Sequence, residues 1–137
     1  MKVVIDTNVL VSGTFFNGLP CQIIEAWRKK KFQLIVSTEI FTEYQQVLEI
    51  LAKTYPSIEI PPLLDYISRN AVFYDGVVLS EQVSEDPDDD KFIACALASN
   101  CQIVISGDKH LLRISGYQNV FVLKPREFVE KYLYGES

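Results

Sequence analysis

The sequence predicts an α/β fold in which a central parallel sheet lies between layers of helices, as a three-layer sandwich. Two observations predict it: short apolar runs recur along the chain, and each run is followed by a segment with helical signals. The runs are residues 3–5, 34–36, 103–105 and 120–123. They lack the polar alternation of a half-exposed strand, so we expect strands that are covered on both faces. With 137 residues, of which 48% are hydrophobic, a single domain spanning 1–137 can bury such a core.

Proline and cap residues place the helices. Pro20 and Pro125 suit a first helical turn, and Ser37 or Thr38 can cap the helix after the second strand. That helix carries an apolar stripe that runs from Ile40 to Leu51. After the first strand we expect a loop before the first helix begins. The predicted helices are residues 19–30, 39–54, 61–71, 90–99, 109–115 and 125–133.

Composition excludes several classes of protein. No apolar run approaches the roughly 20 residues that span a bilayer, and Asp6 interrupts the only candidate signal-peptide stretch. Three unpatterned cysteines favour a reducing, cytoplasmic setting, and the single histidine disfavours a His-rich zinc site or a catalytic triad. The net charge of −5 argues against nucleic-acid binding by bulk positive charge. It still allows a local basic patch beside a metal-loaded acidic centre.

Two aspartates follow strands that the topology can bring together. Asp6 comes directly after the first apolar run, and Asp108 lies just beyond the third. In doubly wound sheets, ligands bind outside the carboxyl ends of the strands. A carboxylate at the edge of a core needs a hydrogen-bonding or charged partner. Asp6 therefore either caps the following turn, together with Asn8, or binds a cation.

Two further acidic groups fit the same edge. Glu43 lies one helical turn before Val47, at the border of the apolar stripe. The segment "SEDPDDDKF" places several carboxylates just ahead of a helix, where acids also serve as ordinary caps and dipole partners. We expect Asp90 to enter the first helical turn and to point towards Asp6, with Asp88 further round towards solvent.

The combination of these acids predicts a metal centre. Packed like charges are unfavourable unless a divalent cation joins them, and no basic residue is expected to neutralise them. Oxygen ligands without His or Cys favour Mg²⁺ or Mn²⁺. Such ions hold phosphate oxygens and activate water for in-line displacement.

Four segments resemble one protein family. They are "VVIDTNVLVSG", "TEIFTEYQQVL", "DPDDDKFIACALASNCQIVISGDKHLL" and "VFVLKPREFV". They resemble PIN-domain proteins, in particular those described as toxins of toxin–antitoxin systems and related to VapC-type ribonucleases. The resemblance covers nearly the whole chain, and "DPDDDKFIACA" followed by "ISGDKHLL" is its most specific part.

The resemblance implies a Mg²⁺- or Mn²⁺-dependent ribonuclease of PIN-like fold, with an antitoxin protein as partner and a homodimeric state. Its catalytic, metal-binding acids match Asp6, Glu43, Asp90 and Asp108. Asn8 and Ser106 match polar positions that orient these acids, and Asp86 is a further supporting candidate. Because acids stand at positions 86, 88, 89 and 90, the register of the third ligand stays open.

Three other functions fit parts of the sequence. A receiver-type phosphoacceptor module would share Ser106 and Lys124 at strand ends, but the chain lacks an acidic pair after its first strand. A phosphatase of the haloacid dehalogenase type would need a second aspartate where Asn8 stands. A PIN fold without catalysis, which binds RNA or protein, is the third alternative.

The candidate RNA-binding residues are few, because the chain is acidic. Lys109 and Arg113 flank Asp108 closely and are expected to steer the RNA substrate, since their charge acts near the scissile backbone. The group at 28–31 is expected to decorate the end of a helix.

Overall fold

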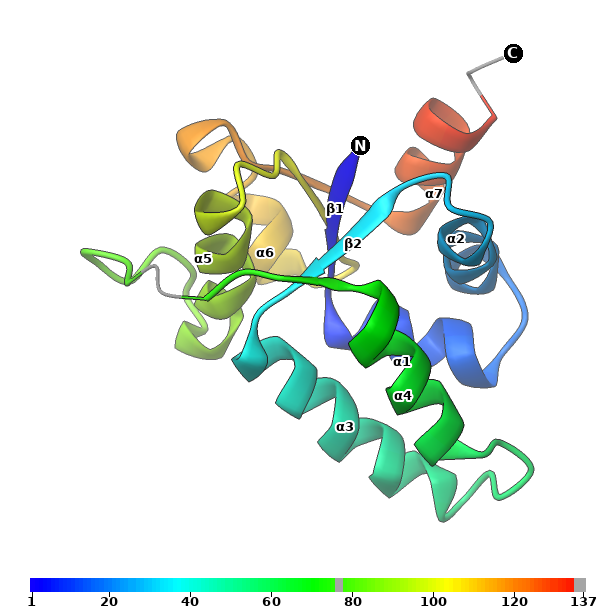
Figure 1. Ribbon diagram of the computed structural model, residues 1–137. Coiled ribbons are helices and arrows are strands. Elements are labelled where there is room, and N and C mark those ends of the chain that lie inside the picture. The colour runs from blue at the N-terminus through cyan, green and yellow to red at the C-terminus, as the bar shows by residue number, and fades with distance from the viewer. Residues whose placement is uncertain (76–77, 135–137) are drawn as a thin grey trace.

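A computed structural model of the chain describes residues 1–75 and 78–134. Its centre is a five-stranded, all-parallel sheet in the order β3-β2-β1-β4-β5 (Figure 1). This architecture confirms the predicted α/β sandwich and places β1 in the middle of the sheet. The strands are β1 (Lys2–Ile5), β2 (Gln33–Val36), β3 (Val72–Phe73), β4 (Ile103–Ile105) and β5 (Phe121–Leu123).

The helices follow the strands nearly as predicted. The α-helices are α1 (Thr7–Phe15), α2 (Leu19–Arg28), α3 (Thr38–Ala52), α4 (Ile60–Asn70), α5 (Asp90–Ala98), α6 (Lys109–Arg113) and α7 (Pro125–Phe128). Short turns of other helical types are η1 (Pro87–Asp89), η2 (Tyr117–Asn119) and η3 (Val129–Leu133). The loop expected after the first strand is wrong, because α1 begins at once. The two-residue strand β3 was not predicted either, since it is too short to give a pattern.

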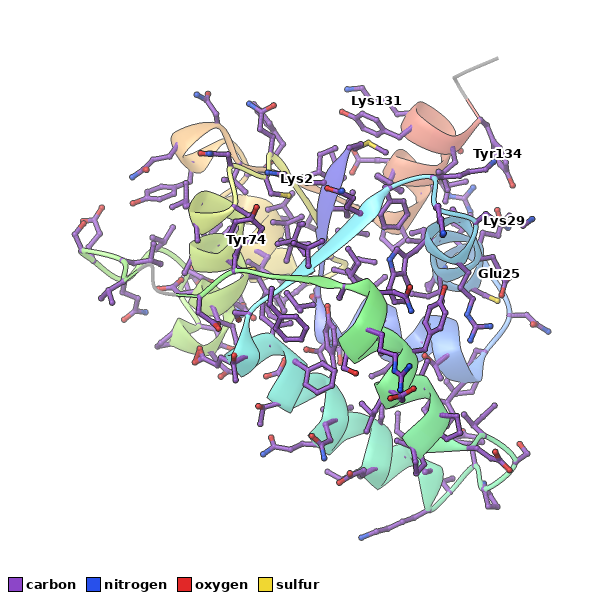
Figure 2. The ribbon with its side chains drawn as sticks, viewed as in Figure 1. Lys2, Glu25, Lys29, Tyr74, Lys131 and Tyr134 are labelled. Carbon is purple, nitrogen blue, oxygen red and sulfur yellow. The ribbon has the colours of Figure 1, made fainter. Side chains whose placement is uncertain are left out.

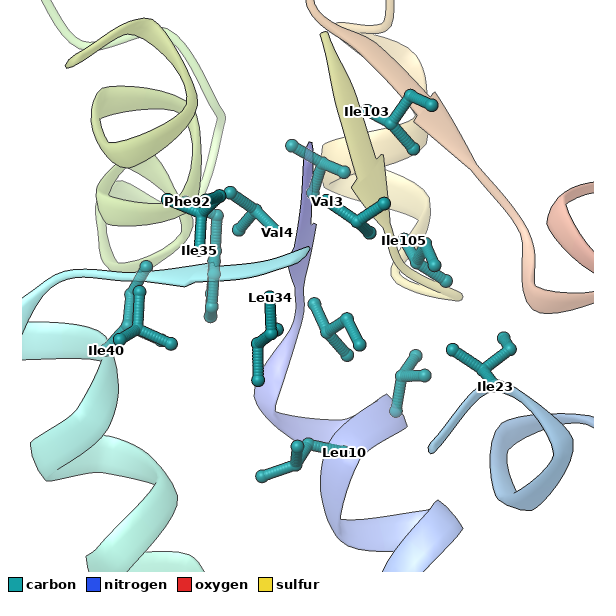
Figure 3. Close-up of a cluster of buried hydrophobic side chains, with 14 of the residues drawn as sticks. Val3, Val4, Leu10, Ile23, Leu34, Ile35, Ile40, Phe92, Ile103 and Ile105 are labelled. Atoms are coloured by element: carbon teal, nitrogen blue, oxygen red, sulfur yellow. The ribbon is translucent and has the colours of Figure 1, made fainter. Parts of the chain in front are cut away.

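Helices cover both faces of the sheet, so that alternate side chains of each strand meet different helices. Val4 pairs with Ile35 across β1 and β2, and both lie on the side of Phe92 from α5 (Figure 3). Val3 and its partner Leu34 point to the opposite layer. All four strand residues have no exposed surface. The unbroken apolar runs in the sequence are explained by this burial on two sides.

The opposite layer contains a close contact between α1 and α2. A Cβ atom at Gly13 would lie 2.6 Å from the Pro20 carbonyl oxygen and 2.7 Å from Ile24 Cγ1. Glycine inside a helix is destabilising by about 1 kcal/mol relative to alanine. Gly13 therefore stands there because the two helices approach too closely for any side chain.

The carboxyl ends of the central strands lie together at one edge. Ile5 pairs with Ile105, so Asp6 and Ser106 leave β1 and β4 side by side. The Asp6 amide donates to the Ile105 carbonyl at 3.0 Å. The buried Tyr44 hydroxyl of α3 donates to the Ile5 carbonyl and ties this helix to the same edge.

Two further findings concern helix length and thiols. Within the described residues, no helix is both long and apolar enough to cross a membrane. Cys21, Cys95 and Cys101 are free thiols, and the last two are buried.

Candidate active site

Asp6 is the most enclosed acidic side chain of the site. It is 5% exposed, its Oδ1 accepts a hydrogen bond from the Asn8 amide at 2.7 Å, and its Oδ2 accepts one from the Ser106 hydroxyl. Burial raises the pKa of Asp6, and the charges of Asp108 and Glu43 raise it further, although the two hydrogen bonds act in the opposite sense. Asp6 therefore caps α1 and at the same time stands among like charges.

Asp108 is joined to Asp6 through one serine. The Asp108 amide donates to Ser106 Oγ at 2.9 Å, and Ser106 in turn donates to Asp6. Asp108 Oδ1 accepts a hydrogen bond from the His110 amide at 2.7 Å and so caps α6. The predicted convergence of Asp6 and Asp108 is explained by the adjacency of β1 and β4.

The third aspartate of this cluster is Asp89, and the predicted orientation of Asp90 towards Asp6 is wrong. Asp89 is 8% exposed, and its pKa is raised to about 6 by burial and by the charges of Asp108, Asp86 and Asp6. Asp90 instead turns to the preceding segment, where its two oxygens accept hydrogen bonds from the amides of Val83 at 2.9 Å and Ser84 at 2.7 Å.

The 3₁₀ turn η1 and the spacing of buried residues in α5 explain why Asp89, and not Asp90, lies in the acidic cluster. The turn places Asp89 immediately before α5, one step ahead of Asp90. Residues three, four and seven positions after Asp89 are Phe92, Ile93 and Ala96, which are all buried. Side chains at these intervals share one face of a helix, so Asp89 extends the buried face. The same intervals were readable in the sequence and would have selected Asp89.

Glu43 reaches the site from α3, where both of its oxygens are occupied. Oε2 accepts a hydrogen bond from the Thr7 hydroxyl, and Oε1 lies 2.9 Å from Lys91 Nζ. Burial alone would lower the pKa of Lys91, but its hydrogen bonds with Glu43 and Asp88 raise it. The expectation that no basic residue neutralises the acids is therefore wrong for Glu43. Sequence reasoning missed both Thr7 and Lys91.

The remaining candidates lie around this centre. Asn8 contributes its backbone amide to Asp6, while its side chain is exposed. Asp86 is exposed and accepts a hydrogen bond from the Asp88 amide at 3.0 Å. Asp88 is exposed, as predicted.

The two predicted RNA-binding residues differ in their surroundings. Lys109 is exposed at the start of α6. Arg113, at the end of the same helix, lies 3.3 Å from a carboxylate oxygen of Glu85. Glu85 also lies 3.3 Å from His110 Nδ1, so one carboxylate contacts two side chains of α6, and it offsets the charge of Arg113 near Asp108.

The donor set fits a hard divalent cation. Within residues 1–75 and 78–134, no three acidic, histidine or cysteine side chains already surround one point as metal ligands do. Yet Asp6 and Asp89 both have raised pKa values, because they are buried and because other carboxylates face them, and a cation would relieve that repulsion. Carboxylate oxygens are the ligands that Mg²⁺ and Mn²⁺ prefer.

Comparison with known proteins agrees with this geometry. The model of the PIN domain family matches residues 2–110, which is most of the chain. The chain belongs to the PIN domain family. PIN domains are generally nucleases that use divalent metals, which favours a nuclease over the receiver and phosphatase interpretations. The matched region of this PIN domain includes every residue of the acidic cluster. No curated protein matches the chain.

Proposed function

We propose that this PIN domain is an endoribonuclease that requires Mg²⁺ or Mn²⁺ and hydrolyses RNA phosphodiester bonds. The observation that carries the proposal is that Ser106 joins Asp6 and Asp108 at the carboxyl edge of the sheet, with the buried carboxylate of Asp89 close enough for both charges to act on it. We assign the third metal-binding acid to Asp89 and keep Glu43 as part of the catalytic site. Asp90 is assigned to holding the segment before α5.

The side chains around the three aspartates fix their orientation. Ser106 donates to Asp6 and accepts from the Asp108 amide, so a single hydroxyl sets the relation between two carboxylates. Asp6, Asp89 and Asp108 would hold the cation, which when bound would contact phosphate oxygens and lower the pKa of a water molecule. Thr7 and Lys91 hold the Glu43 carboxylate beside this centre.

A cleavage assay tests the proposal. Purified protein is incubated with a mixed pool of single-stranded and structured RNA, with Mn²⁺ or with a chelator. We expect cleavage only with the metal, and loss of cleavage in Asp6→Asn. Cleavage that persists in chelator, or in Asp6→Asn protein shown by circular dichroism to be folded, would contradict the assignment.

The sequence motifs support a more specific proposal about biological role. They resemble those of VapC-type toxins, and we propose that the protein acts in the cytoplasm as such a toxin, as a homodimer neutralised by an antitoxin protein. Induced expression should arrest growth of a host cell, and Asp6→Asn should abolish the arrest. Light scattering of the purified protein tests the dimer, and co-expression with the product of the adjacent reading frame tests the antitoxin.

A further inference from the structure

Lys91 is an enclosed cation at the border of the proposed metal centre. Its side chain is 6% exposed, and its Nζ lies 2.9 Å from Glu43 Oε1 and 3.1 Å from Asp88 Oδ1. It also donates to the Asp88 carbonyl at 2.6 Å. An ammonium group has three hydrogens, and these three oxygens account for all of them. Lys91 is therefore fixed in place by its own contacts.

The Glu43 carboxylate is also held by contacts within the chain. Its second oxygen accepts the Thr7 hydroxyl, so each carboxylate oxygen already has a partner in this chain. Asp89 differs, because within the described residues its carboxylate accepts only one hydrogen bond, a long one of 3.5 Å from the Ser84 hydroxyl. Asp89 is the group with unused acceptor capacity in a field of like charges. Glu43 is thus the carboxylate that forms an ion pair with Lys91, whereas Asp89 is exposed mainly to the charges of Asp108, Asp86 and Asp6, with a smaller opposite effect of Lys91.

We infer that Lys91 supplies the cation for Glu43, so that the site binds a single divalent ion, held by Asp6, Asp89 and Asp108. This inference rests on the proposed function. In it, Glu43 and Lys91 are positioning residues rather than metal ligands. For Glu43 to bind a second ion through Oε1, the enclosed Lys91 ammonium would have to give up this partner and lie beside a divalent cation, which is unfavourable for a buried charge.

Counting bound Mn²⁺ tests the inference without any measurement of activity. The informative variant is Glu43→Gln with Lys91→Met, because it removes the ion pair as a unit and leaves the net charge near the aspartates unchanged. Calorimetric titration gives the number of sites and their Kd, and electron paramagnetic resonance of free Mn²⁺ gives an independent count. Glu49→Gln, on the exposed face of the same helix, is the matched control.

We expect one Mn²⁺ per chain in the wild-type protein, and the same in the double variant with a Kd changed by less than about threefold. Asp89→Asn should weaken the Kd by at least about tenfold, in the range seen when groups around a metal are altered. Lys91→Met alone should gain a second, weaker Mn²⁺ site, since Glu43 is then freed.

Two results would overturn the inference while leaving the proposed function standing. One is two Mn²⁺ ions in the wild-type protein. The other is a folded double variant that loses as much Mn²⁺ affinity as Asp89→Asn. If the wild-type protein bound no Mn²⁺, the proposed function would fail together with the inference.

Discussion

Charged side chains at the carboxyl ends of the strands and those elsewhere on the molecule lie in different surroundings. At the carboxyl edge, Asp6 and Asp89 are enclosed and both have raised pKa values. Away from that edge, Lys29 at the end of α2 and Lys131 in η3 are exposed (Figure 2). Lys2 also lies away from that edge, but it donates to the Ser99 carbonyl at 2.7 Å.

The comparison shows that the surroundings of a charged side chain indicate whether it needs a ligand. Exposed lysines at a helix end interact favourably with its carbonyl groups and with water, so their presence needs no ligand. Enclosed carboxylates that face one another are unfavourable in their ionised form unless a cation or a proton compensates their charge. The number of charges therefore says less about function than the surroundings in which the fold holds them.

The largest expected effect is a difference in RNA cleavage rate between the variants Asp89→Asn and Asp90→Asn. Asp89→Asn removes a charge from the facing carboxylates, and we expect the single-turnover rate on RNA with Mn²⁺ to fall by more than about 100-fold, beyond the effect typical of supporting residues. Asp90→Asn keeps one of the two oxygens that accept from the Val83 and Ser84 amides, and because Asp90 lies outside the acidic cluster the variant should retain most of the rate. If Asp90→Asn were inactive and Asp89→Asn active, the third metal-binding acid would be Asp90 and not Asp89.

The second effect is stabilisation by metal. At 100 times its Kd, a ligand that binds only the folded state stabilises it by about 2.7 kcal/mol. We therefore expect Mn²⁺ to raise the Tm of the wild-type protein by several degrees, and Asp6→Asn to lose most of this gain. The control is Asp65→Asn, on the exposed face of α4, and its Tm should respond to Mn²⁺ like that of the wild type. An unchanged melting curve in millimolar Mn²⁺ would count against the site.

The third effect is the pH dependence of stability without metal. The pKa of Asp89 is raised from 3.8 to about 6, so the folded state retains a proton that the unfolded state releases. Its contribution to stability is present at low pH and is lost as pH rises through about 6. In chelator, the Tm of Asp89→Asn should be close to that of wild type at pH 4 and higher by several degrees at pH 7.5, since about 1 kcal/mol shifts Tm by roughly 3–5 °C. Parallel Tm curves for the two proteins would show that Asp89 is not held among like charges.

The smallest expected effect is on RNA affinity. It distinguishes Lys109 and Arg113, near Asp108, from the lysines that follow α2. Replacing Lys109 and Arg113 by alanine should weaken RNA binding and reduce the slope of log affinity against log salt by about 1 for each phosphate group that the protein no longer neutralises. Because Arg113 is paired with Glu85, we expect most of the change to come from Lys109. The Lys29→Ala, Lys31→Ala protein should behave like wild type. If only the Lys29→Ala, Lys31→Ala protein bound RNA more weakly, the RNA-binding surface would include the end of α2 and not α6.

The sequence predicted what depends on apolar runs and strand ends. Buried strands need continuous apolar residues, and residues that leave paired parallel strands must lie together, so Asp6, Ser106 and Asp108 could be assigned to one edge from their positions in the chain. Glu43 was found because the apolar stripe of its helix fixed its direction. These inferences use only helical and strand periodicity.

What the sequence did not show depends on local competition for hydrogen bonds. Asp90 could have faced either the site or the amides of Val83 and Ser84, and only the path of the preceding segment decides between them. Asp6 caps a helix at once because its carboxylate meets the Asn8 amide, a contact that a loop prediction omits. Lys91 and Glu43 meet across two helices that are far apart in the chain, so no pattern of spacing reveals the pair.

Gly13 has a consequence for how much change this chain can tolerate. Its missing side chain lets α2 press against α1, and α1 begins at the residue after Asp6. A methyl group there would push on α1, and Asp6, which we propose as a metal ligand, caps the other end of this helix about two turns away. A larger residue at Gly13 would therefore displace Asp6 through the helix. A screen for inactive variants should recover Gly13 as well as the acidic residues.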